Sequence, residues 1–314
     1  MEKVLLEFIK KIGSLNRATV NGLKAPHKPI LLLSVIESIA FGEIVENKIE
    51  ISPLLVARFK DNWNRLVNTN IFQPNFALPF FHMQKEGFWK LKTYFGKEIL
   101  ITSSHSIKSF SQLKESVAYS YLDSNLFALI QNPKTRDEIY RFITVKYFGK
   151  PETIHKQYGL VDEVTEQILN EPSIEYQKQI EIADDEEIFV RCGVFKRVVP
   201  KIYDYTCCVS GMRIISGYDI QMVDACHIVP FSVSHNDTIS NGISLSPNLH
   251  RAFDRGLITL DEKYRVVISK SFTEYPSENM LKLLEGKQIL LPKDNKHYPS
   301  TENLKWHNYN IFKN

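Results

Sequence analysis

The segment from Val223 to Asp254 constrains this chain most, because it holds histidine, asparagine and aspartate side chains at short spacing. His227 is followed by Asn241 fourteen residues later and by His250 nine residues after that asparagine. His250 begins the helix-like sequence HRAFDRG, and Asp254 follows one helical turn later. Side chains at i and i+4 share a helix face, so His250 and Asp254 are predicted to bind one cation together.

These residue types suit phosphodiester hydrolysis. Histidine has an ordinary pKa of about 6.5 and can activate water as a base, which is the role predicted for His227. A divalent metal on His250 and Asp254 would stabilise charge on the phosphate and the leaving group. Asp224 shares a strand face with Cys226 and is the better candidate for a third metal ligand, because a thiol suits magnesium poorly.

Asn241 is predicted either to orient His227 or to brace the intervening loop. The alternative for the two histidines is that both are ordinary loop residues. The joint spacing of His227, Asn241 and His250, together with the sequence DRG, favours a catalytic site. We therefore predict His227 and Asn241 as catalytic residues, and Asp224, His250 and Asp254 as metal ligands.

The run NGISLSPNLH, residues 241–250, resembles the N-x-x-x-L-C-P-N-C-H segment of HNH (ββα-metal) nucleases. In that family two strands and a helix hold one divalent metal. The resemblance thus implies a metal-dependent endodeoxyribonuclease, with Mg²⁺ or Mn²⁺ as the expected ion. From about residue 195 onward, the sequences HIVPF and HRAFDRGLI are similar to the HNH domain of type IV and related restriction enzymes.

The zinc-binding cysteines of the HNH pattern are mostly absent. Ser246 and Leu249 stand at two of their positions, and the run Cys208-Val209-Ser210-Gly211 keeps one sulfur. A structural zinc needs about four nitrogen or sulfur ligands. We therefore expect no structural zinc here and expect packing and hydrogen bonds to hold the motif.

The N-terminal half resembles the sulfur-binding domain of restriction endonucleases that cut phosphorothioate-modified DNA. The segments that carry this resemblance are APHKPILLL (25–33) and LPFFHM with GFWKL (78–91). The resemblance implies a shallow apolar pocket for the sulfur, flanked by basic groups that hold the phosphates. The implied residues are His27 and Lys28 beside the modified phosphate, and Leu78, Pro79 and His82 around the pocket.

Two of these positions depart from the family pattern. The family often has tyrosine at the position of Leu78 and a smaller residue at that of His82. Simpler explanations also remain open for both segments. Pro26 and Pro29 suit the start of a helix, and Pro79-Phe80-Phe81 suits a core strand.

Charge is divided unevenly along the chain. Residues 1–150 hold 21 basic and 13 acidic side chains, residues 151–190 hold 2 and 11, and residues 191–314 hold 16 and 12. Two basic parts, which suit a polyanionic partner, thus flank an acidic part. A length of 314 residues suits two domains. We predict a recognition domain at 1–150, an acidic connector at 151–190 and a nuclease domain at 191–314.

Apolar spacing and turn signals predict a mixed α+β fold. We expect a mainly helical N-terminal DNA-reading domain with a small sheet, and a C-terminal ββα-metal domain. Helices are predicted at 1–12, 30–40 (the core helix), 51–67, 109–131, 134–148, about 159–180, from Phe195 to a turn near 205, and at the C-terminus. Strands are predicted around the turn at 85–87 and around the turn at 261–262.

The remaining features bear on compartment and partners. Cys192, Cys207, Cys208 and Cys226 show no disulfide spacing, and no apolar run reaches the length of a membrane span, about 18 residues. A reducing cytoplasm is therefore the expected location, without a membrane partner. The expected partner is double-stranded DNA carrying phosphorothioates, and a homodimer is among the arrangements left open.

The leading interpretation is a modification-dependent DNA endonuclease of two domains that recognises phosphorothioated DNA. One alternative is an HNH restriction endonuclease that reads a modified base or a plain sequence. Another is a non-catalytic DNA-binding protein with a decayed nuclease domain.

Overall fold

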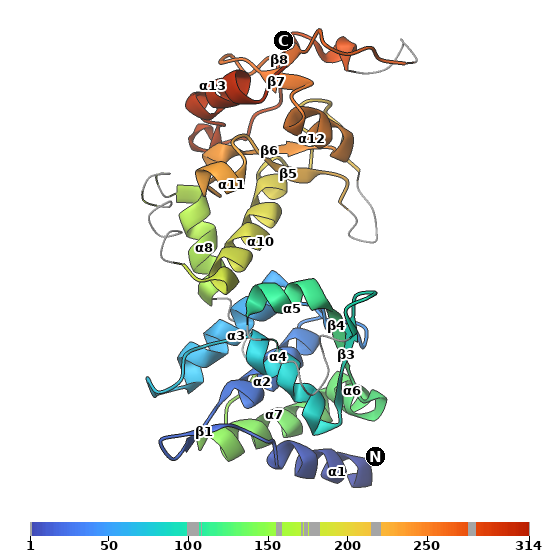
Figure 1. The fold of residues 1–314 in the computed structure, drawn as a ribbon, viewed down its shortest axis with the longest axis vertical. Helices are drawn as coiled ribbons and strands as arrows, with labels where there is room; N and C mark the ends of the chain where they lie inside the picture. Colours follow the sequence, from blue (N-terminus) through green and yellow to red (C-terminus); the bar gives the residue numbers. More distant parts are fainter. Residues whose placement is uncertain are drawn as a thin grey trace. The chain divides into compact units, whose positions relative to one another are not determined.

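The computed structural model describes residues 2–98, 107, 109–154, 159–170, 172, 175, 183–214, 221–275 and 281–313. The chain forms two compact units. Unit 1 comprises Met1–Val161 and Asp185–Val190, and unit 2 comprises Asp162–Asp184 and Arg191–Asn314. Helices dominate and the sheets are small, so the predicted mixed α+β fold is confirmed (Figure 1).

Unit 1 is mainly helical. Its helices are α1 (Glu2–Gly13), α2 (His27–Ala40), α3 (Pro53–Leu66), α4 (Ala77–His82), the 3-10 helix η1 (Met83–Glu86), α5 (Phe110–Ser116), α6 (Ser124–Gln131) and α7 (Pro133–Phe148). Among its described residues, the strands form two antiparallel pairs, β1 (Thr19–Val20) with β2 (Leu23–Lys24), and β3 (Trp89–Thr93) with β4 (Val117–Leu122). Two further helices, α8 (Gly159–Asn170) and α10 (Asp185–Ile202), begin in unit 1 and continue in unit 2.

Helix α2 is the core helix, as the sequence predicts. Its residues from Lys28 to Ile39 are buried, and it packs against α3, α4, α6 and α7. The buried carboxylate of Glu37 accepts hydrogen bonds from Tyr140 Oη at 2.6 Å and from Asn62 Nδ2 at 2.8 Å. Burial nevertheless raises the pKa of Glu37. This polar group thus links α2 to α3 and α7 inside an otherwise apolar core.

Two predictions for unit 1 are wrong. The segment around Phe80 and Phe81, predicted as a strand, forms α4 and η1. Pro79 lies in the first turn of α4, where backbone N–H groups have no helical partner, and the rings of Phe76 and Phe80 pack 5.3 Å apart. The predicted helix at 109–131 is interrupted by β4, whose alternating sequence VAYSYL pairs with β3. A sheet partner there outweighs the helical pattern.

Unit 2 contains the predicted ββα arrangement. Strands β5 (Asp224–His227) and β6 (Gly242–Leu245) pair antiparallel, with His227 opposite Gly242, and α12 (Pro247–Asp254) follows. A Cβ on Gly242 would lie 2.7 Å from Val199 Cγ2 and 3.0 Å from the Phe195 ring. Only glycine therefore lets β6 approach α10 so closely.

The rest of unit 2 surrounds this motif. It contains α11 (Phe231–Ser234), the 3-10 helices η3 (Ile239–Asn241), η4 (Lys282–Leu284) and η5 (Asn295–His297), and helix α13 (Thr301–Asn310). The predicted strands at 256–269 are β7 (Ile258–Leu260) and β8 (Val266–Ile268), which pair antiparallel. Among the described helices of both units, none is long and apolar enough to cross a membrane.

Candidate functional site

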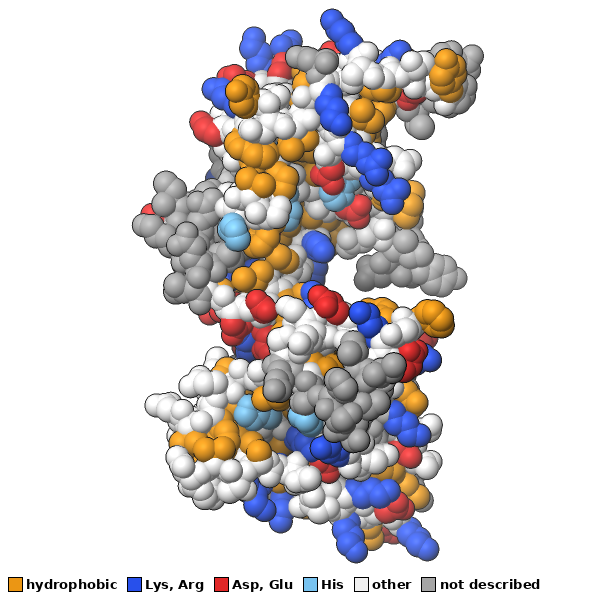
Figure 2. All heavy atoms as spheres, viewed as in Figure 1, with side chains coloured by type: hydrophobic (Ala, Val, Ile, Leu, Met, Phe, Trp, Pro, Cys, Tyr) orange, Lys and Arg blue, Asp and Glu red, His pale blue; other side chains and the backbone are white. Residues whose placement is uncertain are grey.

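The three predicted metal ligands lie on β5 and α12, where both aspartates contact the ring of His250. His250 Nε2 lies 3.4 Å from Asp254 Oδ2, and His250 Nδ1 lies 3.4 Å from Asp224 Oδ2. Their i, i+4 spacing on α12 and the position of Asp224 on the neighbouring strand produce this arrangement. Figure 2 shows surface histidine beside acidic side chains on unit 2. An imidazole binds a cation through one nitrogen, so Nε2 of His250 and the Asp254 carboxylate suit one divalent cation, while Asp224 faces the other ring nitrogen.

Cys226 also reaches this cluster. Ligand atoms of Cys226, His250 and Asp254 all lie within 4.8 Å of one another, and Cys226 Sγ is 3.8 Å from Asp254 Oδ1. Burial, followed by the charge of Asp254, raises the pKa of the Cys226 thiol well above its ordinary value. A protonated thiol is a poorer ligand for Mg²⁺ or Mn²⁺ than a carboxylate. Among the described residues, His250 and Asp254 are therefore the clustered donors that suit such an ion, and Asp224 lies at the other ring nitrogen of His250.

His227 is held by two neighbours within unit 2. Its Nε2 lies 2.6 Å from Oδ1 of Asp237, a residue with no exposed surface. Its ring stacks on Phe195, with centroids 4.1 Å apart and planes 8° apart. Asp237 was not predicted from the sequence, although an acidic residue ten positions after His227 is a visible signal. The fold places Asp237 beside His227 because the chain turns between β5 and β6.

Asn241 braces the loop rather than touching the His227 ring. Its side chain accepts a hydrogen bond from Val229 N and donates to Val229 O and to Asn236 O, each at 2.9 Å. Its backbone oxygen accepts from Ile228 N at 2.9 Å. Asn241 thereby joins the chain just after His227 to the loop that carries Asp237. Of the two roles predicted for Asn241, these contacts favour bracing.

The residue predicted as the base and two of the predicted metal ligands open onto one cavity. A pocket of about 280 Å³ is lined by His227, His250 and Asp254, together with Pro230, Phe231 and other apolar groups. His227 and His250 come from different elements, β5 and α12, yet both face this space. A phosphodiester in the pocket would meet a histidine base and a cation site together.

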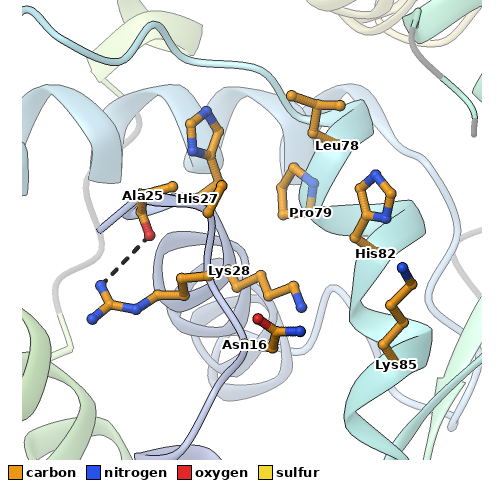
Figure 3. A pocket seen from close by; sticks show the side chains of 10 residues that line it. Asn16, Ala25, His27, Lys28, Leu78, Pro79, His82 and Lys85 are labelled. Atoms are coloured by element: carbon orange, nitrogen blue, oxygen red, sulfur yellow. Dashed lines mark hydrogen bonds between the residues drawn. The ribbon is translucent and has the colours of Figure 1, made fainter. Parts of the chain in front are cut away.

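The predicted DNA-contacting residues line a second pocket, in unit 1. This pocket of about 250 Å³ is formed by Asn16, Arg17, Ala18, Ala25, His27, Lys28, Leu78, Pro79, His82 and Lys85. In Figure 3 the side chains of α4 and η1 stand on one side, and those of Asn16 and the start of α2 face them. All five residues predicted for sulfur and phosphate contacts therefore meet here, and Arg17 and Lys85 add basic groups that the sequence analysis missed.

Lys28 and His27 are less available as cations than their residue types suggest. Lys28 Nζ pairs with the carboxylate of Glu86, and both side chains are nearly buried. His27 Nε2 donates to Gln73 O at 2.9 Å, and its ring packs edge-on against Trp63, 4.6 Å between centroids. Burial lowers the pKa of His27, so its ring is neutral at neutral pH.

Other residues supply an exposed and a half-buried basic group at the pocket, Lys85 and Arg17 respectively. Lys85 is exposed beside His82, and the Arg17 guanidinium lies 4.6 Å from the centre of the Tyr147 ring. Burial and then the charges of Lys85 and Lys28 lower the pKa of His82. An anion bound in the pocket would oppose that effect, since it favours the protonated ring. The lining combines apolar Leu78 and Pro79 with this basic rim.

Comparison with protein families identifies both parts of the chain. Residues 6–163, half of the sequence, match the model of the ScoMcrA-like DNA sulfur-binding domain. The chain belongs to this family. Residues 207–261 match an HNH endonuclease model and include every predicted residue of the nuclease site. The two resemblances inferred from the sequence are thus confirmed, and their combination fits a modification-dependent restriction endonuclease.

Several solved structures are similar to this chain. The sulfur-binding domain of SprMcrA complexed with phosphorothioated DNA is 15% identical, with a TM-score of 0.38, covering 47% of this chain and 88% of that one. The type IV phosphorothioation-dependent restriction endonuclease ScoMcrA is 9% identical, with a TM-score of 0.37, covering 78% and 94%. The modification-dependent TagI restriction endonuclease is 21% identical, with a TM-score of 0.27, covering 37% and 38%. No curated protein sequence matches the chain.

Proposed function

We propose that this protein is an endonuclease that recognises phosphorothioated DNA with unit 1 and hydrolyses phosphodiester bonds with unit 2. One observation carries the catalytic half: His227 and the pair His250 and Asp254 line a single pocket within the segment that matches the HNH model. The family match of residues 6–163 and the mixed apolar and basic pocket support the recognition half.

In the proposed mechanism His227 accepts a proton from the attacking water. His250 and Asp254 would hold a divalent cation, Mg²⁺ or Mn²⁺, and Asp224, beside the other ring nitrogen of His250, would orient that ring. When bound, that cation supplies stabilisation of charge on the phosphate and the leaving oxygen. Asn241 keeps the loop between β5 and β6 in place, so that the base stays beside the cation site.

Recognition rests on the different hydration of sulfur and oxygen. Sulfur is larger and less well hydrated, so burying it against Leu78 and Pro79 costs less than burying a phosphate oxygen there. His27, with its ring on Trp63, forms one wall of the pocket, and His82 forms another. Lys85 and Arg17 would attract the phosphates of any sequence.

We also propose a separate role for each part of the chain. We assign recognition to residues 1–150, connection to the acidic residues 151–190, and cleavage to residues 191–314. The described cysteines are free thiols, which suits the proposed cytoplasmic location. A homodimer is the assembly to look for by sedimentation.

Cleavage of a phosphorothioated duplex in the presence of Mn²⁺ tests this function. We expect the wild-type protein to cut it, EDTA to stop the reaction, and His227→Ala to abolish cutting while DNA affinity stays the same. Affinity should persist because basic contacts elsewhere dominate it. Cutting by a pure, folded His227→Ala variant, or cutting in EDTA, would contradict the proposal.

A further inference from the structure

The neighbours of His227 include a carboxylate that the proposed mechanism leaves without a role. Asp237 lies on the loop before η3, and its Oδ1 is 2.6 Å from His227 Nε2. We propose that Asp237 is the positioning residue for His227, fixing the imidazole as the tautomer with hydrogen on Nε2 and leaving Nδ1 to take the proton from water. This inference rests on the proposed nuclease function.

The burial of Asp237 decides the direction of the hydrogen bond. Asp237 has no exposed surface, and its other oxygen, Oδ2, accepts a contact from Cys192 Sγ at 3.4 Å. A buried carboxylate away from water needs N–H or O–H donors, and an ionised carboxylate can only accept. The Nε2 of His227 must therefore carry the hydrogen that this carboxylate accepts. In the neutral imidazole with hydrogen on Nε2, the lone pair is on Nδ1.

The plane of the imidazole is set from a second direction. Phe195, on α10, stacks on the His227 ring with an interplanar angle of 8°. A hydrogen bond in the ring plane and a stack on the ring face together leave the side chain little freedom to rotate. His227 nevertheless keeps 21% of its side-chain surface exposed, so the ring remains reachable from the pocket that it lines.

The loop that carries Asp237 is itself held in place. Asn236 Oδ1 accepts from Thr238 N at 2.8 Å and from Thr238 Oγ1 at 2.7 Å, on either side of Asp237 in sequence. Asn241 Nδ2 donates to Asn236 O, and Asn241 also bonds the backbone of Val229. Asn241 therefore fixes the distance between the two partners of the His227–Asp237 pair, which gives its bracing a catalytic purpose.

Two measurements on the full-length protein test the inference. The first is a ¹H–¹⁵N correlation spectrum of histidine-labelled protein, with the His227 signals identified by their loss in His227→Gln. The second compares turnover and DNA affinity for Asp237→Asn and for the matched control Asp204→Asn. Asp204 is an exposed carboxylate that pairs with Arg213.

We expect hydrogen on Nε2 of His227 in the wild type, slow exchange of that hydrogen, and a fall in kcat of about 100-fold or more for Asp237→Asn. The amide that this substitution introduces can donate to Nε2, so the spectrum of the variant should show the ring with hydrogen moved to Nδ1. DNA affinity should stay unchanged, and Asp204→Asn should behave as wild type in both measurements.

Contrary outcomes separate this inference from the proposed function. A wild-type protein that cuts DNA, together with undiminished cutting by a folded Asp237→Asn variant, would overturn the positioning role alone. Hydrogen on Nδ1 in the wild-type spectrum would overturn it too, even if the variant failed to fold. A wild-type protein that cuts no phosphorothioated DNA with any divalent metal would overturn the nuclease function, and the positioning role with it.

Discussion

At the residue scale, Lys28 shows how a distant partner changes what a side chain can do. The motif APHKP suggests a free cation beside a phosphate, but Glu86, 58 residues away in sequence, pairs with the Lys28 ammonium. Glu86 also accepts a hydrogen bond from Asn16 N at 3.2 Å. The ion pair therefore joins η1 to the start of α2 and to the loop after α1. Lys28 therefore helps to hold the shape of the pocket and supplies little free positive charge to it.

A substitution at Lys28 should thus affect folding more than DNA attraction. Breaking a buried ion pair leaves an uncompensated charge, and we expect Lys28→Ala to destabilise unit 1 by about 3 kcal/mol. The salt dependence of DNA binding should change little. Lys85→Ala is the matched control, since Lys85 is exposed at the same pocket. The Lys85→Ala variant should unfold with the free energy of the wild type. The slope of log DNA affinity against log salt concentration should become less steep by about one.

Chemical denaturation and DNA titration at several salt concentrations would separate these effects. A stable Lys28→Ala variant with a flattened salt slope would show that Lys28 contacts phosphate directly, as the motif alone predicts.

Pro79 tests the sulfur pocket itself. Pro79→Asp places a carboxylate where the apolar wall stands, so it should remove the preference for phosphorothioated DNA. Pro79→Ala keeps the wall apolar and should retain most of the preference. Competition binding with a modified and a plain duplex measures both variants. A preserved preference in a folded Pro79→Asp variant would place the sulfur elsewhere.

At the element scale, helix α13 is anchored to the nuclease unit by a buried histidine. His307 Nε2 donates to Phe253 O at 3.1 Å, its Nδ1 accepts from Thr259 Oγ1 at 2.8 Å, and its ring stacks on Phe253. Burial lowers the pKa of His307 to about 4. The folded state therefore holds this ring neutral, between α12 and β7.

Acid should consequently weaken unit 2. An unfolded histidine has a pKa of about 6.5. The stability that the neutral, buried His307 ring gives unit 2 is therefore fully present above that pH and is lost as pH falls towards about 4. The loss should reach about 3 kcal/mol. His307→Gln should be less stable at neutral pH but should lose less on acidification. Denaturant midpoints at neutral and acidic pH test this, and an identical acid response in both proteins would contradict it.

Some helices and strands of this protein could be predicted from sequence patterns, and others could not. Helices α1, α2, α3 and α7 follow from apolar spacing, and α2, α3 and α7 also have proline at their starts. The ββα motif was expected from the resemblance of residues 241–250 to HNH nucleases. Strand β4 was missed because its pairing with β3 depends on residues about 30 positions away. Asp237 and Glu86 were missed for the same reason: each acts through a partner that only the fold brings near.

At the scale of the whole molecule, the boundary of the recognition part can be tested directly. Residues Asp185–Val190 belong to unit 1. Glu186 Oε1 accepts a hydrogen bond at 2.8 Å from Phe76 N, at the start of α4, and Phe189 packs against Phe110, 5.2 Å between centroids. Helix α4 carries Leu78, Pro79 and His82, so these contacts support the pocket.

We therefore expect residues 1–190 to fold alone and to bind DNA with the preference of the full chain. Residues 1–150 should also fold and bind DNA, but with a lower melting temperature. In the full chain, Glu186→Ala should lower the affinity for phosphorothioated DNA, although Glu186 itself does not line the pocket. Calorimetry and DNA titration of both fragments provide the check. Equal stability of the two fragments would show that residues 185–190 add nothing to the recognition unit.

The most direct test of the central claim is a competition titration of the full-length protein with one duplex, with and without a single phosphorothioate. Both sulfur stereoisomers should be included, in several sequence contexts. We predict that one stereoisomer binds about ten- to a hundredfold more tightly than the plain duplex, which is what burying a group of that size in an apolar pocket can supply. Equal affinity for modified and unmodified duplexes in every context would contradict sulfur recognition.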